Sequence, residues 1–146
     1  IYEFPISDRD PLPRWSFGRV TLLGDAAHPM WPIGGQAGSQ AIVDARVLAF
    51  ALANMPMAER ALEQYEAQRR PIMTAVTLKN RALGPAIIME IAEQRAPGGF
   101  RNIDDVIARR ELEEISRAYK IEAGLDPEAL NNRPSLNVRR AAPMAG

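Results

Sequence analysis

The stretch that decides the fold of this chain is GDAAHPMWPIGGQAGSQA, residues Gly24 to Ala41. It follows a β-branched apolar run, Arg19–Leu23, and leads into an alanine-rich segment with helical periodicity. The acid Asp25 therefore stands directly beyond a predicted strand, and a loop of small residues connects it to a helix N-terminus. In open α/β sheets, ligands bind beyond the carboxyl ends of strands, and the free N–H groups of a helix N-terminus attract electron-rich groups. The layout predicts a ligand site. In the alternative interpretation, Asp25 caps a turn and the glycines only tighten a loop.

The rest of the chain is predicted to be mainly α-helical, with short β strands at Ile1–Ile6 and Arg19–Leu23. Helices are expected over Gln40–Asn54, over Ala58–Arg81 with an extension towards Arg95, and over Ile103–Ile121. The second strand is apolar on both faces and the first helix is apolar on most sides, so we expect both to be buried. The sheet that would cover this strand is expected to lie mostly outside this sequence.

Two prolines are expected to disturb the long second helix. Pro71 should kink it, because proline lacks the N–H donor and its ring clashes with the preceding turn. Gly84-Pro85 is expected to interrupt it. We divide the chain into a strand, loop and helix unit (1–54), a C-terminal helical region (55–130), and a polar, proline-bearing tail (131–146) that is expected to be mobile.

Composition excludes several classes of function. Lysine plus arginine total 18, as do aspartate plus glutamate, so the net charge is zero, and we expect neither a nucleic-acid nor a membrane partner. The chain has no cysteine and one histidine, His28, which argues against disulfides, thiolate catalysis and metal sites. No signal peptide or membrane-spanning stretch is visible, so we expect a cytoplasmic protein. The first residue is not methionine, which suggests that sequence is missing upstream.

The decisive stretch resembles the second FAD-binding motif of the class A flavoprotein monooxygenases, the family of para-hydroxybenzoate and salicylate hydroxylases. The resemblance runs from about residue 8 to 80, and Ser39-Gln40-Ala41 is most similar to the salicylate- and phenazine-hydroxylase-like members. Upstream, Pro11–Trp15 and Gly18–Val20 resemble the family's lead-in. The matching residues are Gly24–His28, Pro32, Gly34, Gly38, Asp44-Ala45, Leu48-Ala49 and Tyr65-Glu66-Ala67-Gln68-Arg69-Arg70-Pro71.

The resemblance implies roles for individual residues. Asp25 would bind a ribityl hydroxyl of FAD, within a cofactor-binding loop that includes Gly24 and Gly34. Pro32 would line the flavin ring near the reactive C4a carbon and face the catalytic site. Backbone N–H groups around Gly38 and Ser39 would contact the N1–C2=O2 edge of the flavin, stabilising the charge it gains on reduction. Many relatives have asparagine where Ser39 stands, but the contact is mainly through the backbone.

The resemblance also implies an activity and a larger protein. The parent enzyme would take electrons from NADH or NADPH into FAD, and a flavin C4a-hydroperoxide formed with O₂ would hydroxylate a small aromatic substrate. This chain lacks the Gly-x-Gly-x-x-Gly unit that holds the FAD pyrophosphate. It therefore resembles the C-terminal fragment of an α/β, Rossmann-like FAD/NAD(P)-binding fold, inactive alone. Two alternatives are a halogenase or reductase relative that does not hydroxylate, and a helical oligomerisation or interaction module.

Several further residues have structural interpretations. His28 and Asp44 are expected to fix the loop and the packing of the first helix rather than to catalyse. Met30 and Trp31 suit a substrate-pocket wall and core packing equally well. Arg69 and Arg70 are expected to be paired or solvated, like the charged run 109–114. The uncovered apolar surface should promote self-association, most simply as a homodimer.

Overall fold

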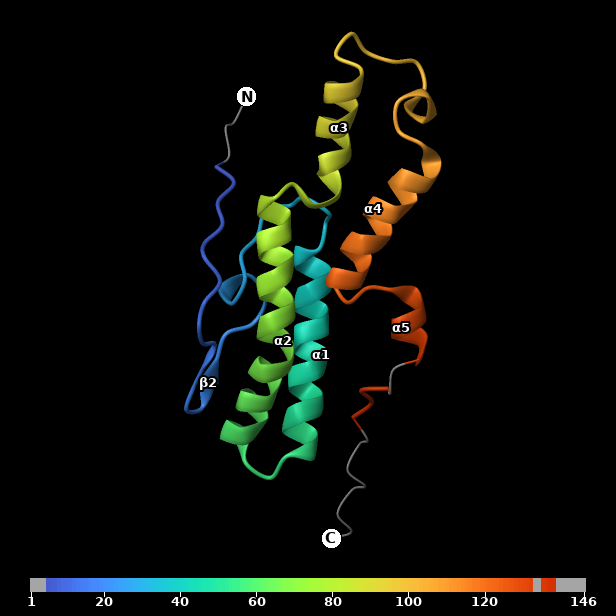
Figure 1. Cartoon of the computed structure of the whole chain (residues 1–146). Helices are drawn as coiled ribbons and strands as arrows, with labels where there is room; N and C mark the ends of the chain where they lie inside the picture. Colours follow the sequence, from blue (N-terminus) through green and yellow to red (C-terminus); the bar gives the residue numbers. More distant parts are fainter. Residues whose placement is uncertain (1–4, 133–134, 139–146) are drawn as a thin grey trace.

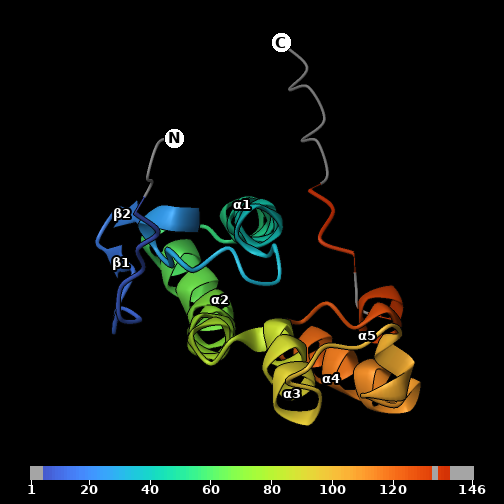
Figure 2. The same cartoon turned by 90° about the horizontal axis from the view of Figure 1, so that it is seen from above.

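Two long helices form the frame of the structure, a computed structural model that describes residues 5–132 and 135–138. α1 (Ala37–Asn54) and α2 (Ala58–Arg81) run side by side as an antiparallel pair (Figures 1 and 2). A short link connects them. α1 ends at Asn54 because the ring of Pro56 disfavours the helical conformation in Met55, the residue before it. Met55 is accordingly extended, with φ −113° and ψ 138°.

Both predicted helices are confirmed, with one shifted boundary. α1 begins at Ala37, three residues before the predicted start at Gln40, while α2 matches its predicted bounds. Along α2, a buried stripe at helical spacing includes Leu62, Tyr65, Arg69 and Val76. α2 continues through Pro71 to Arg81, and the kink expected at this proline stays a prediction.

The predicted strands are shorter than expected. β1 (Ser16–Phe17) and β2 (Val20–Thr21) form a two-stranded antiparallel hairpin, with Ser16 opposite Thr21. Val20 is 65% exposed, because the hairpin partner covers only one edge, as expected for a strand whose covering sheet lies mostly outside this sequence. Of the strand expected at Ile1–Ile6, residues 1–4 lie outside the described residues, and Pro5 and Ile6 form no strand.

After α2 the chain changes direction at two 3₁₀ turns, and the end of α4 then contacts the helix pair again. The predicted interruption at Gly84-Pro85 is confirmed as a 3₁₀ turn, η2 (Gly84–Ala86), followed by α3 (Ile87–Arg95). The continuous helix predicted over Ile103–Ile121 is wrong at its start: it comprises η3 (Ile103–Asp105), a bend, and α4 (Arg109–Glu122). Asn102 caps η3 through Asp104 N–H, and the bend buries Ile107 completely. α5 (Pro127–Asn132) follows, and most of the predicted mobile tail lies outside the described residues.

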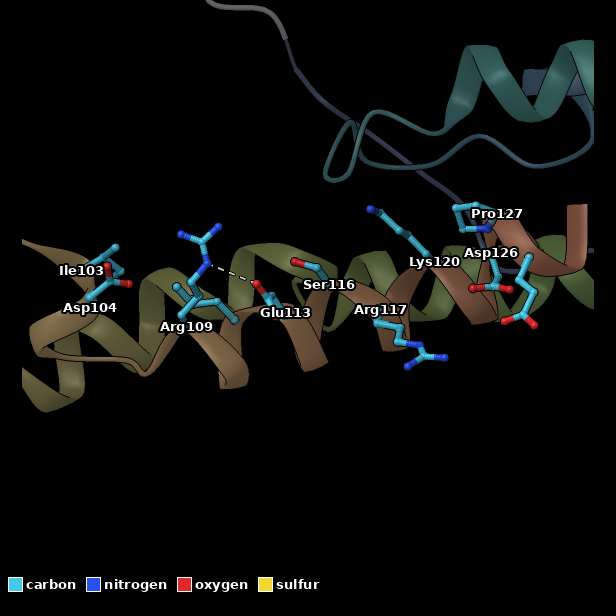
Figure 3. A pocket seen from close by; sticks show the side chains of 11 residues that line it. Ile103, Asp104, Arg109, Glu113, Ser116, Arg117, Lys120, Asp126 and Pro127 are labelled. Carbon is cyan, nitrogen blue, oxygen red and sulfur yellow. Dashed lines mark hydrogen bonds and ion pairs between the residues drawn. The ribbon is translucent and has the colours of Figure 1, made fainter. Parts of the chain in front are cut away.

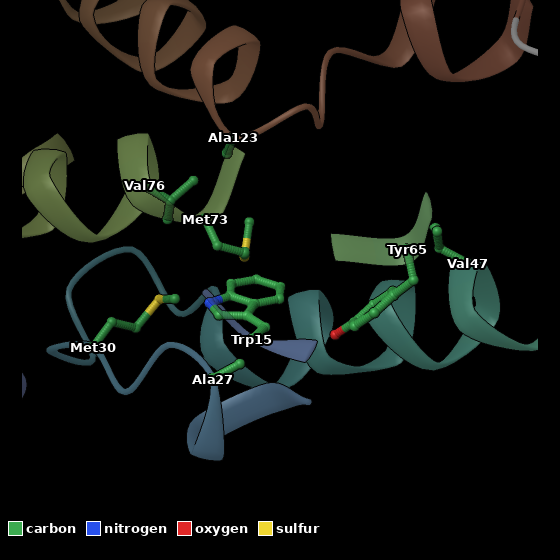
Figure 4. Close-up of a cluster of buried hydrophobic side chains, with 8 residues drawn as sticks. All are labelled: Trp15, Ala27, Met30, Val47, Tyr65, Met73, Val76 and Ala123. Carbon is green, nitrogen blue, oxygen red and sulfur yellow. The ribbon is translucent and has the colours of Figure 1, made fainter. Parts of the chain in front are cut away.

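An apolar cluster joins the loop to both long helices and to the end of α4 (Figure 4). Trp15, which precedes the hairpin, packs at its centre and is 2% exposed. The Tyr65 ring lies 5.9 Å from Trp15, centroid to centroid. The remaining members come from the loop, both long helices and the end of α4: Ala27, Met30, Val47, Met73, Val76 and Ala123. The decisive loop is thus held on a packed core.

One side of α1 is not covered by the described residues. Ile42 is 72% exposed and Leu52 46% exposed, and Ala45 and Ala49 are exposed between them. Among the described residues, only the face of α1 towards α2 and the loop finds partners, so α1 exposes the uncovered apolar surface that was expected. The predicted self-association would use this apolar stripe, and the homodimer stays a prediction.

Among the described helices, none combines the length and apolar character needed to cross a membrane.

Candidate functional site

Asp25 sits on a turn whose shape depends on the glycine before it. Leu23 is extended (φ −146°, ψ 146°), and η1 (Gly24–Ala26) follows directly and packs against α1. Gly24 is buried with φ +58°, and a Cβ at this position would lie 3.2 Å from the Ala41 Cβ. This close, left-handed turn favours glycine and leaves Asp25 exposed.

The Asp25 carboxylate is available for a ligand. No side-chain hydrogen bond caps η1, so the structure gives no support to the alternative in which Asp25 caps a turn. Among the residues that the structure describes, no hydrogen bond or ion pair engages this carboxylate.

A second turn holds Pro32. The N–H of Gly35 donates to the Pro32 carbonyl at 3.1 Å. Pro32 is exposed, and together with Ile6, Trp31 and Ile33 it lines an apolar hollow of about 270 Å³. Met30 and Trp31 were each expected either to line a pocket or to pack in the core, and the structure distinguishes them. Trp31 lines the hollow, whereas Met30 packs in the core at 8% exposure.

Gly38 and Ser39 lie exposed in the first turn of α1. The first hydrogen bond of this helix runs from the Gln40 N–H to the Gln36 carbonyl at 2.9 Å. The N–H groups of Ala37, Gly38 and Ser39 precede that bond, and Gln36 provides no side-chain cap. These donors, with the positive end of the helix dipole, suit an electron-rich ligand edge.

A buried ionic network fixes the decisive loop to both long helices. Asp44 of α1 is fully buried; its Oδ2 lies 2.6 Å from His28 Nε2 and accepts from the Gly24 N–H at 3.2 Å. Arg69 Nε of α2 donates to Asp44 Oδ1 at 2.6 Å. Arg69 Nη2 also donates to Gln40 Oε1 at 2.6 Å. His28 and Asp44 thus have the structural roles expected of them, and Arg69 is paired.

Burial and the charges of this network shift the pKa values of Asp44 and of the neighbouring Tyr65. Burial alone would raise the pKa of Asp44, but hydrogen bonds with His28 and Arg69 and the positive charge of Arg69 outweigh it and lower this pKa. Burial, together with the neighbouring Asp44 charge, raises the pKa of Tyr65. The Tyr65 hydroxyl stays protonated at neutral pH and donates to the Leu22 carbonyl at 3.2 Å.

We predict that the chain loses stability in acid through Asp44. Its folded pKa lies below the ordinary 3.8, so the unfolded chain binds more protons as pH falls. The stabilisation is complete above the ordinary pKa and is lost as pH drops through the lowered one. Urea unfolding between about pH 6 and pH 2 should show the midpoint falling below about pH 4.

The variant Asp44→Asn should flatten that pH dependence, because asparagine does not titrate. Glu113→Gln is the matched control, since Glu113 pairs with Arg109 on the exposed face of α4. An equal pH dependence in Asp44→Asn and in the unchanged chain would contradict the prediction.

A second hollow lies away from the predicted residues (Figure 3). This groove of about 670 Å³ runs along α4 to the start of α5. Its charged side chains carry both signs, and Arg109 pairs with Glu113 at 3.2 Å within it. This pairing confirms that the run 109–114 is a solvated helix face, and none of the predicted site residues lines the groove.

The stretch that carries the loop Gly24–Ala41 matches a known protein family. Residues 7–80, half of the chain, match the family model described as FAD binding domain. The chain belongs to the FAD-binding family of the class A flavoprotein monooxygenases. The match spans η1, both turns, α1 and nearly all of α2, so the network of Asp44 and Arg69 is part of this flavoprotein domain.

Three curated relatives of this flavoprotein chain are hydroxylases or monooxygenases by name. The phenazine 1,6-dicarboxylic acid hydroxylase of Lysobacter antibioticus is 56% identical over 81 residues, covering 56% of this chain and 20% of the relative. The 3-hydroxybenzoate 6-hydroxylase 1 of Aquipseudomonas alcaligenes is 53% identical over 64 residues, covering 44% and 16%. The 6-hydroxynicotinate 3-monooxygenase of Bordetella bronchiseptica is 52% identical over 48 residues, covering 33% and 12%. The chain spans at most a fifth of these relatives' length.

Two features of the site were missed by the sequence-based reasoning. Gln40 links Arg69 to the Ala123 carbonyl at the end of α4, 3.0 Å from its Nε2. Tyr119 of α4 donates to Asn80 Oδ1 at 2.8 Å, beneath the turn Pro32–Gly35. Both hydrogen bonds join residues that are far apart in the sequence, and no local pattern predicts such pairs. The one available indication is a polar residue on an otherwise apolar helix face, as at Gln40.

Proposed function

We propose that this chain supplies part of the FAD site of an enzyme that uses NADH or NADPH and O₂ to hydroxylate a small aromatic substrate. The observation that carries the proposal is the exposed Asp25 carboxylate at the end of an extended segment, beside the open N-terminus of α1. In this proposal the chain is the C-terminal part of an α/β, Rossmann-like FAD-binding fold and is inactive alone.

The residues present fit part of the cofactor. Asp25 would accept a hydrogen bond from a ribityl hydroxyl, and the N–H groups at Gly38 and Ser39 would face the electron-rich edge of the ring. Gly24 and Gly34 would give the backbone turns that let the cofactor approach. The apolar hollow at Pro32 would receive a flat ring and exclude water from it. When bound, FAD supplies the electron transfer and oxygen chemistry.

The relatives support the same type of reaction. The names of the three described above are those of hydroxylases and a monooxygenase of aromatic or heteroaromatic compounds. A halogenase or reductase relative would share the FAD contacts but not the hydroxylated product. A pure interaction module would not respond to flavin at all, so an FAD titration separates it from the other two proposals.

We predict that Asp25→Ala weakens FAD binding about ten- to a hundred-fold in the product of the complete open reading frame that contains this sequence. A charge-assisted hydrogen bond contributes about 1.5–3 kcal/mol, and about 1.4 kcal/mol corresponds to tenfold in affinity. The measurement is an FAD titration of the apoprotein by flavin fluorescence. Asp105→Ala is the control, because Asp105 is an exposed acid on η3.

A change at Pro32 should have the opposite pattern. Pro32→Ala is expected to leave FAD affinity nearly unchanged and to lower the ratio of hydroxylated product to NAD(P)H consumed, because it opens the apolar hollow. Wild-type FAD affinity in Asp25→Ala would show that the role assigned to this carboxylate is wrong. Stoichiometric FAD on the 146-residue chain alone would overturn its proposed inactivity.

A further inference from the structure

The Tyr119 side chain reaches from α4 to the loop that carries Pro32. Tyr119 is 5% exposed, although its immediate neighbours on α4 are exposed. A Cβ at Gly34 would lie 2.5 Å from the Tyr119 hydroxyl oxygen, and one at Gly84 would lie 3.2 Å from the opposite edge of the ring. The ring therefore fills a slot that two glycines leave open.

Asn80 continues this contact to the backbone of the same loop. It is 1% exposed, accepts from the Tyr119 hydroxyl at 2.8 Å, and donates from Nδ2 towards the Trp31 carbonyl at 3.4 Å. Burial raises the pKa of Tyr119, so the hydroxyl remains a donor at neutral pH. A polar group buried this deeply destabilises the fold if it has no hydrogen-bond partner. This favours the one arrangement in which the Tyr119 hydroxyl, the Asn80 side chain and the Trp31 carbonyl are bonded to one another.

The end of α4 is anchored independently of this pair. Ala123 packs in the core, and its carbonyl accepts from Gln40 Nε2 at 3.0 Å. Lys79 of α2 pairs with Glu122 at 3.2 Å. In Figure 1 the C-terminal end of α4 accordingly lies against the helix pair. The part of α4 that carries Tyr119 is thus held in place by other contacts. It lies outside the stretch 7–80 that matches the family.

We propose that Tyr119 and Asn80 are positioning residues that clamp the turn Pro32–Gly35 and so set the shape of the hollow at Pro32. The clamp makes the C-terminal helical region a determinant of how tightly the hydroxylation couples to NAD(P)H consumption. The consequence for coupling rests on the proposed function, whereas the clamp itself does not.

The clamp is tested on the 146-residue chain without flavin, by NMR hydrogen exchange. The reporter is the Gly35 amide, whose bond to the Pro32 carbonyl closes the turn. Tyr119→Phe keeps the ring and removes the donor, and it should speed exchange at Gly35 about five- to tenfold relative to core amides of α2, the expected effect of one lost hydrogen bond. Tyr65→Phe is the matched control, because it removes another buried tyrosine hydroxyl from the same core. It should leave Gly35 unchanged relative to those amides.

A pair of glycine variants gives a second test that does not change Tyr119. Gly34 and Gly35 both have positive φ, but a Cβ at Gly35 meets nothing within 4 Å. Gly34→Ala should therefore displace the Tyr119 ring resonances and open the turn, whereas Gly35→Ala should leave those resonances unchanged. Unchanged Gly35 exchange in Tyr119→Phe would overturn the clamp. If that variant does not fold, identical ring shifts in the two alanine variants would overturn it instead.

The flavin-loaded protein separates the clamp from the proposed function. In the product of the complete open reading frame, Tyr119→Phe should change the visible absorption spectrum of bound flavin and lower the product-to-NAD(P)H ratio at least twofold, with FAD affinity within about twofold. If that protein binds no FAD, the proposed function fails while the exchange result still decides the clamp. If it binds FAD and Tyr119→Phe matches wild type in spectrum and coupling, the clamp has no role in the reaction.

Discussion

Replacing Asp44 by alanine is expected to lower the free energy of unfolding by about 3–5 kcal/mol, the usual cost of removing one partner from a buried ion pair. Asp44 is fully buried, and both of its oxygens are engaged. Its removal strands the Arg69 guanidinium at 4% exposure and leaves the Gly24 N–H without its acceptor. The stranded charge, rather than the lost attraction, accounts for most of the expected cost.

The measurement is urea unfolding at neutral pH, followed by circular dichroism. Glu113→Ala is the matched control: it also breaks a carboxylate–arginine pair, but both of its side chains are more than half exposed, so no measurable change is expected. The double variant Asp44→Ala/Arg69→Met should recover part of the loss, since it removes the stranded charge. Equal stability of Asp44→Ala and Glu113→Ala would contradict the stabilising role of the network. If Asp44→Ala does not fold, Asp44→Asn replaces it in the comparison.

Truncating Trp15 to alanine is expected to cost about 3–5 kcal/mol, as for other large aromatic residues in packed cores. The indole is 2% exposed, and its ring centroid lies 5.5 Å from that of His28 and 5.9 Å from that of Tyr65. It separates the loop from the long helices at the centre of the apolar cluster (Figure 4). The cavity left by its removal could not close without moving His28 and the turn behind it.

The unfolding of Trp15→Ala is also followed by circular dichroism, because the variant loses one of the chain's two tryptophans. Phe17→Ala is the control: Phe17 is an aromatic residue two positions away, in β1, but is 56% exposed. It should cost much less than Trp15→Ala. The fluorescence of Trp31 should still respond to unfolding in both variants. A cost for Trp15→Ala no larger than that for Phe17→Ala would show that the cluster is not centred on this residue.

The sequence alone determined the two long helices and the family. The bounds of α2 follow from its apolar periodicity, and the break before it follows from Pro56, because both are properties of neighbouring residues. The order Gly24-Asp25, then Pro32, then Gly38-Ser39 before an alanine-rich helix was enough to predict the flavoprotein family that residues 7–80 match. The cofactor roles of those residues remain predictions.

Only the tertiary structure decided which of these residues meet. Periodicity places Arg69 on the buried stripe of α2, but its pairing with Asp44 requires the antiparallel packing of α1 on α2. The exposure of Val20 and Ile42 depends on what lies beside them, which hydrophobicity does not specify. The glycine at position 34 is explained by a tyrosine 85 positions later in the chain, at Tyr119. Such contacts depend on how distant segments pack, and local propensity carries no information about them.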